Sequence, residues 1–169
     1  MVATKITLEQ LSRRVKLLPQ QMTKAVVRGL QASGQRLQVM VVEEIQGADP
    51  YPAVNMGDLL RSVHTDFVHD GAEVIVDAPH AAHMEYGTRP HFPPVAPLKE
   101  WVMQKGISGD EEEAWGIALA IARNMAIWGI EPRNYMANAM ARLEQDDVIS
   151  QEVAREMARI ARHPFRRLG

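Results

Sequence analysis

Three histidines and a glutamate lie close together in the middle of the chain and could bind a metal ion. They are His80, His83, Glu85 and His91. If this segment is helical, His80 and His83 occupy neighbouring positions on one face, as a pair of metal ligands requires. A zinc site needs three or four converging ligands, and this spacing matches no metalloenzyme signature. We therefore interpret these residues as surface or interface histidines. A small metal-dependent hydrolase that uses all four residues is the alternative.

The sequence contains no other arrangement that is typical of catalysis. It has no Gly-x-Ser-x-Gly elbow and no glycine-rich phosphate loop. It has no cysteine, which excludes disulfides, thiolate catalysis and cysteine-ligated zinc. The carboxylate pair Glu43-Glu44 falls on an expected helix, where adjacent side chains point about 100° apart, so we expect it to be solvated. We predict that the chain is not an enzyme and has no catalytic residue, metal or cofactor.

Composition indicates a soluble globular protein. The chain has 169 residues, of which 46% are hydrophobic, and its net charge of −2 gives no general attraction to nucleic acid. No apolar run is long enough to span a membrane, and the first residues lack the apolar core of a secretory signal. We therefore expect synthesis in the cytoplasm. We predict a single domain over 1–169, with an N-terminal arm (1–19), a core (20–145), and a C-terminal helix with a basic tail (146–169).

A long helix is predicted over residues 20–46, with Pro19 at its start. Small residues at Gly29, Ser33 and Gly34 interrupt its good helix formers. They either allow a sheet or a neighbouring subunit to approach closely, or they mark a bend.

Helical patterns also cover the C-terminal half of the chain. They span 95–105, 110–128 and 134–162. Asp110 is expected to cap the second by accepting from the amide of Glu113 while Glu113 reaches back. The third is expected to break near 146–150, with Ser150 as a second cap.

Between these regions, a short helix over 57–61 precedes two strand-like runs, 62–68 and 72–78. Asp70-Gly71 between them predicts a hairpin turn. The predicted fold class is α+β: a long N-terminal helix packed on a small antiparallel β-hairpin, with a helical C-terminal half.

Three motifs occur in order along the chain: NMGDLLRSV (55–63), HAAHMEYGT (80–88) and EPRNYM (131–136). The order and spacing resemble the minor tail-component, or tail-completion, family of tailed bacteriophages. That family shows Gly-x-Leu-x-x-Ser-hydrophobic, then Tyr-Ala-x-x-hydrophobic-Glu-aromatic-Gly-Thr, then Pro-x-Pro-Phe-hydrophobic before a C-terminal helix. The resemblance covers about residues 20–145. His80 replaces the family's Tyr, Asn134-Tyr135 replaces Pro-Phe, and the insertion over 91–128 is longer than in the smallest members.

The resemblance implies a virion structural protein at the head–tail junction or the tail terminus, synthesised in the cytoplasm of the host bacterium. It implies a ring of copies of this chain, sixfold or a multiple, that contacts portal, adaptor, tail-terminator or tail-tube proteins and passes DNA only as cargo.

A DNA-binding accessory protein, based on the basic stretch 155–167, is a further alternative; helix-dipole compensation or protein docking would also explain that stretch. For Glu85 the sequence allows a pair with Arg89, an orienting role, or a subunit contact. The motif or interface residues that the resemblance implies are Leu59, Arg61, Ser62, Met84, Glu85, Tyr86, Gly87, Thr88, Tyr135 and Met136.

Overall fold

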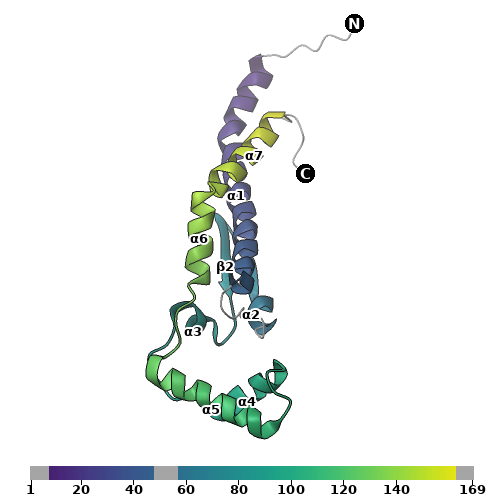
Figure 1. Cartoon of the computed structure of the whole chain (residues 1–169). Coiled ribbons are helices and arrows are strands. Elements are labelled where there is room, and N and C mark those ends of the chain that lie inside the picture. The colour runs from purple at the N-terminus through teal and green to yellow at the C-terminus, as the bar shows by residue number, and fades with distance from the viewer. Residues whose placement is uncertain (1–7, 48–56, 163–169) are drawn as a thin grey trace. The chain divides into compact units, whose positions relative to one another are not determined.

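The computed structural model describes residues 8–47 and 57–162, and their fold is α+β as predicted (Figure 1). A long N-terminal helix precedes a two-stranded antiparallel sheet of order β1-β2, and the C-terminal half is helical. None of the described helices has the length and apolar character needed to cross a membrane. The elements are α1 (Leu8–Gly47), α2 (Gly57–Arg61), β1 (Val63–Val68), β2 (Gly71–Val76), α3 (Ala81–Tyr86), α4 (Val95–Gln104), α5 (Glu111–Trp128), α6 (Tyr135–Gln145) and α7 (Val148–Arg162).

The chain divides into two compact units, each made of separate stretches of sequence. Unit 1 comprises 1–37, 65–74 and 143–169, and unit 2 comprises 38–64 and 75–142. The division falls inside α1 and inside both strands. The single domain over 1–169 therefore stays a prediction.

Helix α1 begins earlier than predicted, because Pro19 lies inside it rather than at its start. A proline within a helix lacks the N–H that would bond to the carbonyl four residues earlier. The chain continues through this position, and the Thr23 hydroxyl donates to the Pro19 carbonyl oxygen at 3.0 Å. Parts of the predicted arm, of the loop after the long helix and of the basic tail lie outside the described residues, at 1–7, 48–56 and 163–169.

In unit 1, the small residues of α1 are contact points, as one of the two interpretations expected. A β-carbon at Gly29 would lie 2.6 Å from Cα of Val153 in α7, so α7 crosses α1 here at close range. A β-carbon at Gly34 would lie 2.5 Å from Cβ of Ala72 in β2. The Ser33 hydroxyl is buried and donates to the Gly29 carbonyl oxygen at 2.8 Å. The predicted close packing of this helix on a sheet is thus confirmed.

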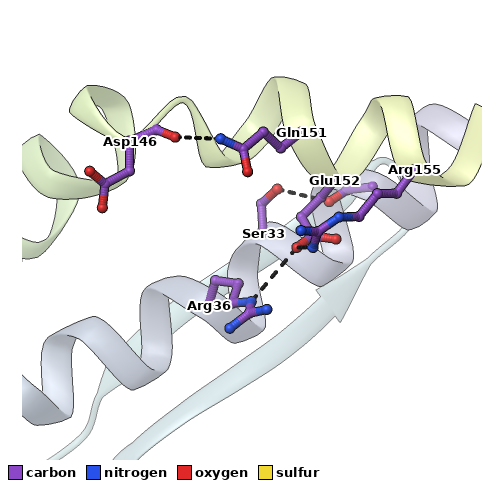
Figure 2. Close-up of polar contacts among 7 residues, drawn as sticks. Ser33, Arg36, Asp146, Gln151, Glu152 and Arg155 are labelled. Carbon is purple, nitrogen blue, oxygen red and sulfur yellow. Dashed lines mark hydrogen bonds and ion pairs between the residues drawn. The ribbon is translucent and has the colours of Figure 1, made fainter.

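An ion-pair cluster lies at the α1–α7 contact (Figure 2). Glu152 of α7 accepts from Arg155 on its own helix at 2.5 Å and lies 3.7 Å from Arg36 of α1. Both arginines are well exposed, so these pairs are worth about 0–1 kcal/mol and do not determine the contact. The close approach of the two helix backbones at Gly29 determines where α1 and α7 are in contact.

The predicted break in the last helical pattern is confirmed, but its predicted cap is wrong. Helix α6 ends at Gln145 and α7 begins at Val148, with Asp147 between them at a φ of 50°. Ser150 therefore lies within the first turn of α7 instead of before it. The Gln151 amide group donates to the Asp146 carbonyl oxygen at 2.9 Å, as Figure 2 shows, and so joins the two sides of the break.

The hairpin turn is shifted by one residue from its predicted place. The turn residues are His69 and Asp70, and Gly71 already belongs to β2. Gly71 is buried and faces Leu30 of α1. The prediction of an Asp70-Gly71 turn is therefore wrong, because this glycine lies in β2, in van der Waals contact with the long helix.

Unit 2 contains the large buried side chains of the described chain, namely Val41, Ile45, Leu59 and Val102. Within it, α4 packs against α5, whose buried face is made of alanines.

Asp110 caps α5 as predicted and accepts from the amide of Glu113 at 2.8 Å. The return contact differs, because the Glu113 carboxylate accepts from the Ser108 hydroxyl at 2.7 Å, and the Asp110 amide donates to that hydroxyl oxygen at 3.1 Å. Ser108 thus takes part in the cap.

Candidate functional site

Two of the three sequence motifs meet in unit 2 and are joined by backbone hydrogen bonds. The amide of Arg133 donates to the Met84 carbonyl oxygen at 2.9 Å, and that of Asn134 donates to the Glu85 carbonyl oxygen at 3.1 Å. Thr88 and Ile130 form an antiparallel bridge. We call this region, residues 81–88 with 129–137, the Glu85 junction.

Glu85 holds the start of α6 in place. Its side chain is buried, and its two carboxylate oxygens accept from the amides of Met136 at 3.0 Å and Ala137 at 3.2 Å. The first amides of a helix have no partner within the helix, and negative charge is favoured at this end. Glu85 therefore acts as an N-terminal cap supplied from a distant part of the chain. Of its three expected roles, the orienting one is confirmed, no pair with Arg89 is formed among the described residues, and a contact across a subunit boundary stays a prediction.

Tyr135 makes a second connection between α6 and α3. Its ring is buried, with 4% of the residue exposed, and its hydroxyl donates to the Ala81 carbonyl oxygen at 3.0 Å. Burial, together with the nearby charges of Glu85 and Tyr86, raises the pKa of Tyr135 to about 12. Tyr135 stands where the resembled family favours Phe. The hydroxyl of Tyr135 has a specific partner in the Ala81 carbonyl oxygen.

Gly87 ends α3 with a φ of 70°, a conformation that strongly favours glycine. A β-carbon there would also lie 2.9 Å from the backbone nitrogen of Pro132. The glycine of the second motif is thus required both by its own backbone and by the close passage of the third motif.

The first motif forms a helix end of its own. Leu59 is fully buried in the core, and the Ser62 hydroxyl donates to the Leu59 carbonyl oxygen at 2.8 Å at the end of α2. Arg61 is exposed and pairs with Asp58. The first two residues of this motif, 55–56, lie outside the described residues.

The remaining motif residues differ widely in exposure. Met84 is buried, whereas Thr88 and Met136 are partly exposed. Tyr86 is 78% exposed and points out of the junction. Of the predicted interface residues in the junction, Tyr86 is the one that a partner could contact over most of its surface.

A cavity of about 650 Å³ beside the junction, which we call the histidine groove, is lined by all three of the clustered histidines. His91 contacts the Arg89 carbonyl oxygen through Nδ1 at 2.9 Å, and Glu85 is committed to backbone amides. Among the described residues, no three His, Cys, Asp or Glu side chains are placed to hold a metal ion. The ligand set of the alternative hydrolase is therefore not assembled.

A second cavity, of about 740 Å³, is lined by the end of α1, the end of α5 and the loop before α6. We call it the Trp128 groove. Trp128 lines it and is 74% exposed, at the point where α5 ends. Glu43 and Glu44 line it from α1, and Glu131 lines it from the loop. The sequence patterns did not reveal this site; a large aromatic residue directly before a helix-ending glycine was the available signal.

The Glu43-Glu44 pair is not simply solvated, and that prediction is wrong. Arg142 of α6 donates to Glu44 at 2.8 Å through one terminal nitrogen and to Glu43 at 2.9 Å through the other. These hydrogen bonds raise the pKa of Arg142. The two terminal nitrogens of the Arg142 guanidinium lie far enough apart to reach both carboxylates. Glu43 and Glu44 therefore share one partner although their side chains point in different directions.

Comparison of this chain with protein-family models, with curated proteins and with solved structures finds no match. The three ordered motifs and the geometry of the described residues are thus the basis for any functional assignment.

Proposed function

We propose that this chain is a virion structural protein of a tailed bacteriophage, which forms a ring at the head–tail junction or the tail terminus. The resemblance of the three motifs supports the class of protein. The Glu85 junction supports a mechanical role, because the motif residues that it contains hold α3 and α6 together.

The observation that carries the assembly part of this proposal is the small apolar core of unit 1. Among the residues whose burial is described, 19–47 and 57–162, the buried hydrophobic side chains that belong to unit 1 are Ala25 and Leu143, and the others belong to unit 2. Val153, Met157 and Ile160 recur along one side of helix α7; all three are half-buried, and Val153 lies against Gly29 of α1. The part of this apolar side that α1 leaves exposed is available for contact with further chains.

In such a ring, each subunit presents one surface to the next and a different surface to the previous one. Such heterologous contacts close into a ring when the rotation between subunits closes. The net charge of −2 suits a wall along which DNA slides without binding. Portal or adaptor proteins on one side, and tail-terminator or tail-tube proteins on the other, are the proposed neighbours.

The mass of the particle in solution tests this proposal. Light scattering and sedimentation of the full chain, alone and mixed with purified portal, adaptor and tail rings, are expected to show a discrete complex of several copies. Ile160→Glu, on the half-buried side of α7, is expected to prevent assembly, whereas Arg159→Glu, at the adjacent exposed position, serves as the matched control. Circular dichroism checks that both variants keep their helices. A monomer at every concentration, indifferent to each of these rings, would refute the proposal.

The basic stretch gives little support to DNA binding. Arg155 and Arg159 pair with Glu152 and Glu156 on the same helix, so part of the positive charge of α7 is offset locally. Binding to phosphates requires cations that can replace counterions along the nucleic acid. We therefore keep assembly as the proposed function of this end of the chain.

A further inference from the structure

The Trp128 groove combines a large exposed aromatic side chain with a concave surface. Trp128 is 74% exposed and its neighbour Ile127 is 61% exposed. The cavity of about 740 Å³ lies within the range of about 300–1,000 Å³ that is typical of ligand pockets. Tryptophan is also among the side chains that are enriched where a few residues dominate the binding energy of a protein interface. These features indicate a docking site for a segment of protein.

The charge of the groove identifies the chemistry of that segment. Glu43, Glu44 and Glu131 contribute three carboxylates to the lining, and Arg133 contributes one guanidinium. Arg142 bonds to Glu43 and Glu44 but supplies a single positive charge for the two. The site keeps a net negative charge beside an exposed indole. Arginine fits both features, because it bonds to carboxylates in a fork and stacks on the face of tryptophan.

We propose that residues 163–169 of a second copy of this chain bind in the Trp128 groove. This segment has the sequence HPFRRLG, so it offers Arg166 and Arg167 to the carboxylates and Phe165 to Trp128. The inference rests on the proposed self-association and names one contact through which it occurs. A tail of one copy in a groove of the next is a heterologous contact, and it can therefore repeat around a ring.

A labelled peptide of residues 163–169 tests this contact by fluorescence anisotropy. The receptor is the full chain that carries Phe165→Ser, Arg166→Glu and Arg167→Glu, so that its own tail does not compete. We expect saturable binding that weakens as salt is added, because the contact is largely ionic. Trp128→Ala is expected to weaken binding about 30-fold, as for the loss of an interface residue that dominates binding. Trp115→Ala on the same helix is the matched control, since Trp115 is 47% exposed and does not line the groove.

Charge exchange gives a second, independent measurement. Glu131→Arg in the receptor is expected to weaken binding of the natural peptide and to restore binding of a peptide that carries Arg167→Glu. Equal losses with Trp128→Ala and Trp115→Ala, or equal binding of a peptide with the same residues in scrambled order, would overturn the inference.

The failure of this inference is distinguishable from the failure of the proposed function. Absence of peptide binding, while the unaltered chain still forms a complex of several copies, overturns the tail contact alone. Peptide binding by a chain that never assembles with itself or with phage rings overturns the proposed ring and leaves the groove as a peptide-binding site.

Discussion

Replacing Gly29 by alanine adds a methyl group at the place where α7 crosses α1. The new β-carbon would lie 2.6 Å from Cα and 2.8 Å from the backbone nitrogen of Val153. Backbone atoms cannot move away by a side-chain rotation, so α7 as a whole has to shift. Such overpacking costs about 1–3 kcal/mol. The gain in helix propensity from glycine to alanine offsets about 0.8–1.0 kcal/mol of this cost.

Gly116 provides the matched comparison, because it lies in helix α5 and a β-carbon there would meet no atom within 4 Å. Gly116→Ala is therefore expected to stabilise the protein by about 1 kcal/mol through propensity alone. Both variants gain the same helix propensity, so the difference between their changes in the free energy of unfolding is the cost of the clash alone, about 1–3 kcal/mol. Urea unfolding followed by circular dichroism measures both free energies of unfolding. If Gly29→Ala stabilises the protein as much as Gly116→Ala does, the close crossing of α7 over α1 is incorrect.

Three further predictions concern unit 2. Glu85→Ala leaves two amides at the start of α6 without a partner and is expected to lower the free energy of unfolding by about 2–4 kcal/mol, with Glu85→Gln intermediate in urea unfolding. Tyr135→Phe removes one hydrogen bond and costs about 1 kcal/mol at neutral pH. Folding raises the pKa of Tyr135 from 10.0 to about 12. The contribution of the Tyr135 hydroxyl to the free energy of unfolding is therefore fully present below pH 10 and is lost as the pH rises toward 12. The free energy of unfolding of the phenylalanine variant should lack this pH dependence. Arg142→Met leaves Glu43 and Glu44 to repel each other, so the variant is expected to be less stable than the natural chain in low salt and to approach it in high salt.

The sequence predicted well those features whose causes are local. The apolar spacing located the helices to within a few residues, except at the start of α1, and Asp110 was identified as a cap because the amide that it accepts from is three residues away. Pro19 misled the prediction, since proline at a helix start is a preference that a long helix can override. Gly71 misled it as well, because this glycine lies in β2 against α1 and not in the turn.

The contacts that define the candidate site are not local, and this is why the sequence did not reveal them. Glu85 caps a helix that begins about fifty residues later, and a cap supplied from outside leaves no signature at the helix itself. Arg142 joins residues that are nearly a hundred positions away. Periodicity and spacing report which face of an element is apolar, but they do not report which element lies opposite that face. The motifs located the junction only because they occurred together and in order.

The bridge between Thr88 and Ile130 has a consequence for how this chain can vary in length. The chain leaves the junction at Thr88, forms α4 and α5, and returns to a residue hydrogen-bonded to its point of departure. A segment whose two ends already touch can be lengthened, shortened or exchanged at small entropic cost, because the closure is provided outside it. We therefore expect changes in the length of the segment between Thr88 and Ile130 to disturb the Glu85 junction less than changes elsewhere in unit 2.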